Sequence, residues 1–152
     1  MYEIKSRVLK SEPTLVMRNR LALSAVGEWL CRAYETTAKV AGDRIAGPPF
    51  ARFHIVKKNP VEFEIEAGFP VESEATGSGE VVSSSLPGGL AAGASHMGSY
   101  GSLEPTYLAV QDWLEEHGAL PDGDPWEVYY SDPTEDPDVA SWRTELVQPY
   151  TA

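Results

Sequence analysis

A six-residue segment occurs twice in this chain of 152 residues. The segment Ala-Val-Gly-Glu-Trp-Leu at residues 25–30 returns as Ala-Val-Gln-Asp-Trp-Leu at residues 109–114. Each copy is followed by a glycine- and proline-containing stretch and then by an aromatic, strand-like segment. The same order of elements at two places predicts one domain made of two repeats, at about residues 1–71 and 80–151. Because duplicated units usually bury faces between them, we expect a ligand cleft between the halves.

The two copies differ at one chemically important position. Where the first copy has Ala51, the second has Glu127. Residues two apart in a strand share a face, so Glu127 and Tyr129 should point one way and Trp126 and Val128 the other. The position at which the repeat loses its symmetry is the best functional lead in the chain.

Two amphipathic helices are predicted. Residues 23–40 place apolar side chains at spacings of three and four, with Ser24 as a candidate N-terminal cap and Gly42 as the end. The second helix has Ser102 as its candidate cap and Pro105 in its first turn, where proline is tolerated.

The remaining apolar segments predict strands, and the whole predicts an α+β fold. Its order is strand-helix-strand-strand, twice, in a mainly antiparallel sheet with two helices on one side and the ligand cleft between the halves. The strands are expected at residues 2–9, 14–18, 50–56, 61–71, 81–86, 90–96, 126–130 and 142–147.

One predicted strand alternates apolar and acidic residues. Glu62, Glu64 and Glu66 point to one face and apolar side chains to the other, as in a sheet with one buried face. The acidic row is either a solvated face or the lining of a pocket, and the alternation alone does not choose between them.

The composition narrows the class of protein. The formal net charge is -11, which repels phosphate backbones and argues against direct nucleic-acid binding. No apolar run approaches the roughly 18 residues of a membrane span, so we expect a cytoplasmic protein without membrane contact. Cys31 is the single cysteine and the three histidines lack ligand spacing, so neither a metal site nor a cofactor is expected.

Several short motifs follow one another along the chain. They are Pro-Pro-Phe-Ala-Arg-Phe-His at 48–54, Glu-Ile-Glu-Ala-Gly-Phe-Pro-Val at 64–71, Leu-Pro-Gly-Gly at 86–89, His-Met-Gly-Ser-Tyr at 96–100, Trp-Glu-Val-Tyr at 126–129 and Trp-Arg-Thr-Glu-Leu at 142–146. In this order they resemble the GyrI-like domain, which is also the effector-binding domain of AraC-type and MerR-type multidrug regulators. The resemblance runs from about residue 15 to the C-terminus.

The resemblance implies a cleft that binds lipophilic, often cationic, compounds above a glutamate, which matches Glu127 here. Regulators of the family carry a DNA-binding module before this domain. The match begins within the first twenty residues, so we expect a stand-alone member. Some stand-alone members are similar to hydrolases that open the cyclopropane ring of DNA-alkylating natural products, and others to inhibitors of DNA gyrase.

A carboxylate in an apolar cleft loses several kcal/mol of hydration unless something compensates. A lipophilic cation can neutralise Glu127, with aromatic rings adding about 0.5 to 2 kcal/mol each. Alternatively, Glu127 takes up a proton and becomes a general acid or base for the attack of water, assisted by Tyr129. The candidate ligand-binding residues are Glu127, Tyr129, Tyr100, Phe53, Trp142, Met17 and Tyr34.

Three hypotheses about function follow. The leading one is a small-molecule-binding protein that captures lipophilic cations. The alternative is a hydrolase of cyclopropane-bearing natural products, in which Glu127 and Tyr129 are catalytic. The third, an interaction with DNA gyrase, has only the acidic loop at residues 132–138 as support.

Overall fold

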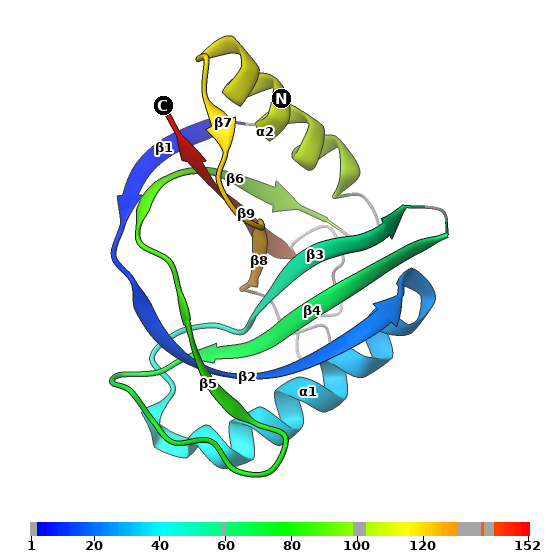
Figure 1. Ribbon diagram of the computed structural model, residues 1–152, viewed down its shortest axis with the longest axis vertical. Helices are drawn as coiled ribbons and strands as arrows, with labels where there is room; N and C mark the ends of the chain where they lie inside the picture. Colours follow the sequence, from blue (N-terminus) through cyan, green and yellow to red (C-terminus); the bar gives the residue numbers. More distant parts are fainter. Residues whose placement is uncertain (1–2, 59, 99–102, 131–137, 139–141) are drawn as a thin grey trace. The chain divides into compact units, whose positions relative to one another are not determined.

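The computed structural model describes residues 3–58, 60–98, 103–130, 138 and 142–152. The chain divides into two compact units. One is Ser11–Pro87, and the other combines Met1–Lys10 with Gly88–Ala152. The described residues of each unit form an antiparallel sheet with one α-helix against it (Figure 1), which confirms the predicted α+β fold.

In the unit Ser11–Pro87 the strands lie in the order β3-β4-β2-β5, and all neighbours are antiparallel. Two short 3-10 turns flank its helix. The elements are β2 (Glu12–Ala22), η1 (Leu23–Ala25), α1 (Val26–Ala41), η2 (Gly42–Arg44), β3 (Phe50–Lys58), β4 (Val61–Pro70) and β5 (Val82–Leu86).

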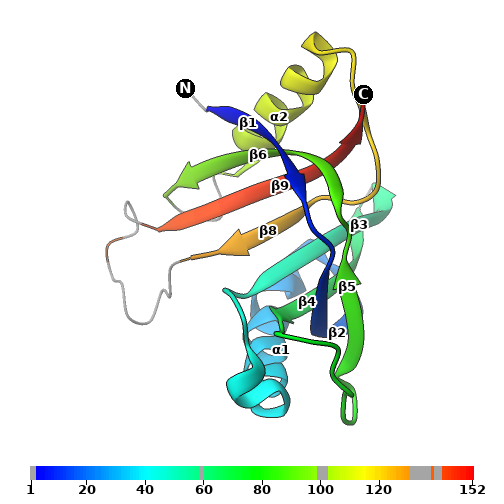
Figure 2. The same ribbon diagram turned by 90° about the vertical axis from the view of Figure 1, so that its left-hand side faces the viewer.

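In the second unit the strands lie in the order β8-β9-β6-β1, and the short strand β7 also pairs with β9. Figure 2 shows α2 next to β6 and β9, on which it packs. The elements are β1 (Ile4–Leu9), β6 (Gly89–Met97), α2 (Glu104–Glu116), β7 (Leu120–Pro121), β8 (Trp126–Tyr129) and β9 (Arg143–Thr151).

The two units have the same plan, but they are not the two sequence repeats. β1 precedes β2 in the chain yet pairs with β6, and β5 precedes β6 yet pairs with β2. Each unit therefore takes its edge strand from the other half of the sequence. The register aligns the units residue by residue, because Phe50 pairs with Gly68 as Trp126 pairs with Val147.

Helix α1 follows the predicted pattern but not its predicted start. The residues Val26, Trp29, Ala33 and Thr37 are buried, and Gly42 ends the helix with a φ of 58°, a conformation that favours glycine. The prediction that Ser24 caps the helix is wrong. The chain enters the helix through the 3-10 turn η1, where the backbone N–H of Val26 donates to the carbonyl of residue 23. A backbone carbonyl, not the Ser24 side chain, therefore accepts from this first N–H.

Helix α2 has Pro105 in its first turn, as predicted. Its buried residues are Thr106, Val110 and Leu114, and the last two belong to a core with Leu146 of β9. The candidate cap Ser102 lies outside the described residues.

The acidic row of β4 lies on the face away from α1. The ring of Phe69 contacts that of Tyr34 on α1, with 5.8 Å between the ring centroids. Residues two apart in a strand share a face, so the odd-numbered residues of β4 face the helix and the three glutamates face away from it. Glu66 accepts from Arg18 Nε at 3.1 Å and from Ser84 Oγ at 3.0 Å. Glu62 lies 3.4 Å from Arg20 Nε, so Glu62 and Glu66 are both ion-paired on the face opposite the helix.

Candidate functional site

Glu127 is a buried carboxyl group held by two tyrosines. It lies on β8, opposite Leu146 of β9, and is only 8% exposed. Tyr129, two residues along the same strand, donates its hydroxyl to Oε1 at 2.7 Å. Tyr107 of α2 donates its hydroxyl to Oε2. The side chain therefore lies on the helix-covered face of its sheet, and both of its oxygens accept hydrogen bonds.

Burial controls the protonation of this group. Loss of hydration raises the pKa of Glu127 above its ordinary value, because burial destabilises the charged carboxylate more than the neutral acid. The hydrogen bonds from Tyr107 and Tyr129 and the charge of His96 act in the opposite direction and do not cancel the effect. The pKa of Tyr107 is also raised, by burial first and by the neighbouring Glu127 second. The tyrosine therefore remains a donor.

A buried polar row accompanies the carboxyl group. His96 on β6 is opposite Thr144 on β9, which in turn is opposite Tyr129 on β8. His96 is 3% exposed, and its Nδ1 lies 3.3 Å from the hydroxyl of Thr106 on α2. Polar groups at this depth are rare unless they are hydrogen-bonded or functional. The row marks this part of the sheet as more than simple core.

Of the predicted site residues, the structure brings together Glu127 and Tyr129. Trp142 belongs to the same unit, precedes β9 and is partly buried. Tyr100 lies outside the described residues. The roles of these residues in ligand binding stay predictions.

Three further candidates lie in the unit Ser11–Pro87. Tyr34 donates to the carbonyl of Phe50 at 2.9 Å. The ring of Phe53 contacts that of Phe63 at 5.6 Å, and Met17 is buried on β2. Their part in a ligand site, and the cleft between the repeats, also stay predictions.

Sequence reasoning missed two residues of the site, Tyr107 and His96. Tyr107 lies in the apolar stripe of α2 with Val110 and Leu114, and its ring packs against their core. A tyrosine in such a stripe needs a partner for its hydroxyl, and this signal could have linked it to the carboxyl group.

The register supports the comparison of Ala51 with Glu127. Ala51 is opposite Ala67 as Glu127 is opposite Leu146, and both residues point toward the helix of their own unit. Ala51 is fully buried. The same position carries a methyl group in one unit and a carboxyl group in the other.

Residues 48–151 match the family of the GyrI-like small molecule binding domain. The chain belongs to this family. No curated protein sequence matches the chain. Several solved structures share its fold, and their sequence identities are low.

The C-terminal domain of EcmrR is 19% identical, with a TM-score of 0.80 over 99% of this chain and 98% of that one. A hydrolase encoded by lin2189 from Listeria innocua is 13% identical, with a TM-score of 0.68 over 98% and 92% of the two chains. SAV2435, solved bound to tetraphenylphosphonium, is 11% identical, with a TM-score of 0.68 over 99% and 94%.

The GyrI-like domain was also expected to lack a metal site and a membrane span. Among the described residues, no group of three or more histidine, cysteine or acidic side chains is arranged to hold a metal ion. In the same part of the chain, no helix is both long and apolar enough to cross a membrane.

Proposed function

We propose that this GyrI-like domain captures lipophilic cations, with the charge of Glu127 as the recognition element. The observation that carries the proposal is the buried carboxyl group between Tyr107 and Tyr129. Burial penalises the carboxylate in the empty protein. A bound cation offsets that penalty by its attraction to the carboxylate, and this attraction contributes to the binding free energy.

The two tyrosines also define the kind of cation. Each oxygen of Glu127 already accepts one hydroxyl donor, so only one lone pair on each remains, too few for the three N–H donors of a primary ammonium at a buried position. A quaternary ammonium or phosphonium has no donor and needs only proximity to the charge and to aromatic faces. We therefore expect donor-free cations to bind more tightly. The structure of SAV2435 with tetraphenylphosphonium, a cation of this kind, supports the proposal.

The test is a titration of tetraphenylphosphonium into the wild type and into Glu127→Gln. We expect the substitution to weaken binding at least about tenfold, since one buried charge-assisted interaction is lost. Glu64→Gln is the matched control, because it removes a carboxylate from the helix-free face of β4. Equal affinities for the three proteins would rule out charge recognition by Glu127.

The same carboxyl group also supports a second function, hydrolysis of a strained, cyclopropane-bearing compound. A raised pKa brings Glu127 nearer to neutrality, where a carboxyl group exchanges protons with water efficiently. Water would attack one ring carbon as a C–C bond of the cyclopropane breaks, and its proton would pass to the carboxylate form of Glu127. The electron pair of the broken bond would take the proton of the Tyr129 hydroxyl, which Glu127 then restores across their hydrogen bond. The likeness in fold to a Listeria innocua hydrolase is compatible with this reading.

Incubation with a cyclopropane-bearing alkylating compound, followed by mass spectrometry, separates the two functions. A product heavier by one water that forms with the wild type and not with Glu127→Gln favours hydrolysis. Unchanged compound that co-purifies with the protein favours binding alone.

An interaction with DNA gyrase is the third hypothesis from the sequence. The gyrase hypothesis depends on residues 132–138, of which only Asp138 is described. A pull-down with purified gyrase is its test. The expectations of a cytoplasmic protein and of no direct nucleic-acid binding stay predictions.

A further inference from the structure

The helix-free face of the unit formed by Met1–Lys10 and Gly88–Ala152 carries a hollow of about 330 Å³. Its charged residues are Glu3, Lys5, Arg7, Arg143 and Glu145, and residues 93–95 of β6 also line it. The volume equals that of roughly ten water molecules, which suits a small organic molecule.

This hollow is separate from the site of Glu127. Gly93 and Glu145 alternate along β6 and β9 with Ala92 and Leu146, which belong to the core beneath α2. Since neighbouring residues of a strand point to opposite faces, the sheet lies between the two sites. A ligand in the hollow would not touch the Glu127 carboxyl group.

Positive charge gathers here against the trend of the chain. The sequence has 12 lysines and arginines and 23 acidic residues, yet three cations and two carboxylates line the hollow. Glu145 is the most buried of these charges, with a side chain 12% exposed. It accepts from Arg7, and its other oxygen lies 3.8 Å from Arg143. One carboxylate thus holds two guanidinium groups at the same place.

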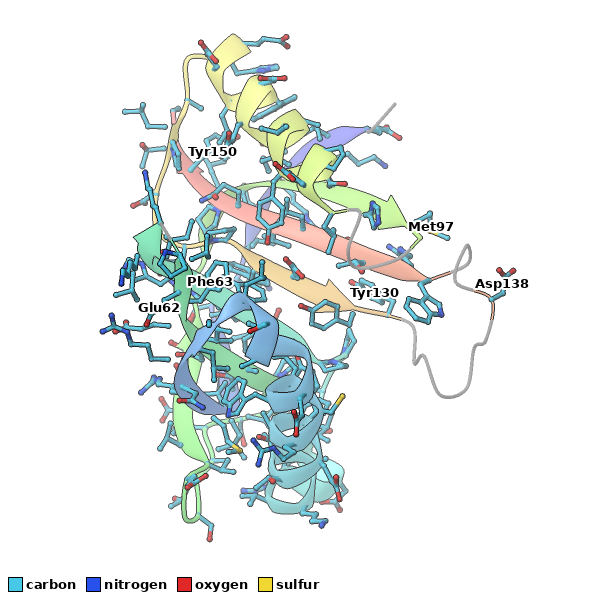
Figure 3. The ribbon with its side chains drawn as sticks, turned by 90° about the vertical axis from the view of Figure 1, so that its right-hand side faces the viewer. Glu62, Phe63, Met97, Tyr130, Asp138 and Tyr150 are labelled. Carbon is cyan, nitrogen blue, oxygen red and sulfur yellow. The ribbon has the colours of Figure 1, made fainter. Side chains whose placement is uncertain are left out.

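Two further contacts fix the arginines. The guanidinium of Arg143 lies over the ring of Tyr130, 4.3 Å from its centroid; Tyr130 follows β8 and is labelled in Figure 3. Gly93 leaves room for Arg7, because a Cβ atom at this position would lie 3.2 Å from Nη2. A residue without a side chain thus lets the arginine cross β6 toward Glu145.

Comparison of the two units shows that this charge is not a by-product of the fold. The register makes Glu145 equivalent to Glu66 and Arg7 equivalent to Ser84, and both pairs are hydrogen-bonded. At the five equivalent positions one unit has three cations and one carboxylate, whereas the other has one cation and two carboxylates. The first set is Lys5, Arg7, Ser95, Arg143 and Glu145, and the second is Val82, Ser84, Arg18, Glu64 and Glu66.

From this arrangement we infer that the hollow is a second binding site, for a small organic anion that carries carboxylate or phosphate groups. Guanidinium groups match the geometry of both oxyanions and are weakly hydrated, so they bind them at partly buried positions. Lys5 adds a positive charge on a side chain that is 73% exposed and lies 3.9 Å from Glu3.

The test is an NMR titration of the full-length protein with citrate and, separately, with pyrophosphate. Sodium chloride keeps the ionic strength constant, so that general screening does not change. We expect saturable shifts of the backbone amides of Gly93, Ser95 and Glu145 with at least one of the two anions. The anion that binds more tightly identifies the site as one for carboxylates or for phosphates.

Variants separate this site from general attraction between charges. Arg7→Gln should weaken binding at least about tenfold, whereas Arg18→Gln, which removes one positive charge from the corresponding face of the other unit, should not. Gly93→Val installs the side chain that equivalent Val16 carries and should also weaken binding. Glu127→Gln should leave anion binding unchanged. Melting temperatures show whether each variant is folded.

Two results would overturn the inference. One is the absence of saturable shifts at these amides with either anion. The other is an equal effect of Arg7→Gln and Arg18→Gln in folded proteins, which would mean that the anions respond only to net charge.

Discussion

The carboxyl group of Glu127 loses its water on folding and receives two tyrosine hydroxyls in exchange. This exchange is incomplete, since its pKa remains raised above the ordinary value of 4.5. The folded protein therefore holds a proton that the unfolded chain has already released at the same pH. By linkage, this group stabilises the folded protein most at low pH, and the free energy of unfolding falls as the pH rises from the unfolded pKa through the folded pKa.

We predict that the free energy of unfolding of the wild type falls relative to that of Glu127→Gln as the pH rises above 4.5. The difference should level off above the raised pKa, because the group is then charged in both states. Urea unfolding at several pH values measures it, and all other carboxyl groups cancel in the comparison. A difference that is constant, or that grows with pH in favour of the wild type, would contradict the assignment.

Tyr107 is expected to tune this proton. Its hydroxyl stabilises the charged form of Glu127, so Tyr107→Phe should raise the pKa of the acid further. On the proposed function, the pH at which cation affinity reaches half of its maximum should therefore move upward. Tyr34→Phe is the control, since that hydroxyl donates to the carbonyl of Phe50 and not to a carboxylate. The same midpoint in both variants would mean that Tyr107 has no such role.

At the scale of the elements, close contact between strands decides which residues are allowed. Gly68 on β4 lies against β2, and a Cβ atom there would be 2.0 Å from the carbonyl oxygen of Leu15. A backbone atom cannot move aside as the end of a side chain can. In the other unit the equivalent residue is Val147, so the corresponding pair of strands, β9 and β6, accommodates a side chain at this position.

Gly68→Ala should therefore destabilise the protein by about 3 kcal/mol, through overpacking against the backbone. The same substitution at Gly27 in α1 should have the opposite sign. No heavy atom lies within 4 Å of a Cβ there, and alanine is favoured over glycine in a helix by up to about 1 kcal/mol. Chemical unfolding of both variants makes the comparison. Similar free energies of unfolding for the two variants would show that β2 and β4 can move apart at Gly68 without destabilising the protein.

At the scale of the whole molecule, the exchange of β1 and β5 links the two halves of the sequence. A cut in the connector at residues 72–79 leaves β1 without β6 and β2 without β5. Both fragments would then present unpaired backbone at a sheet edge. Each half of the sequence thus lacks one strand of the unit to which most of it belongs.

We predict that fragments 1–76 and 77–152 fold poorly alone and regain structure when they are mixed. The fragment 11–87, which contains every strand of its unit, should be the better folded single piece. Circular dichroism and amide NMR spectra of the separate and mixed fragments measure the difference. Two independently folded halves of the sequence would contradict the exchange.

Much of this architecture could be predicted because it depends on local patterns. Apolar spacing in residues 23–40 and at Val110 and Leu114 specifies the buried side of each helix before any partner is known. Alternation along β8 places Glu127 and Tyr129 on the same face. The repeat itself identified Ala51 and Glu127 as equivalent, and the register agrees.

The sequence by itself therefore determined two helices, eight of the strands and the position of the unusual carboxyl group. It did not give the short strand β7, and two strands precede each helix where the predicted repeat has one. Only the tertiary structure decided what surrounds that group and which strands pair. Tyr107 is 20 residues from Glu127, and Arg7 is 138 residues from Glu145. Periodicity indicates which face of its own helix or strand a side chain occupies. It carries no information on which distant element will lie opposite, because that choice depends on chain closure and packing over the whole unit.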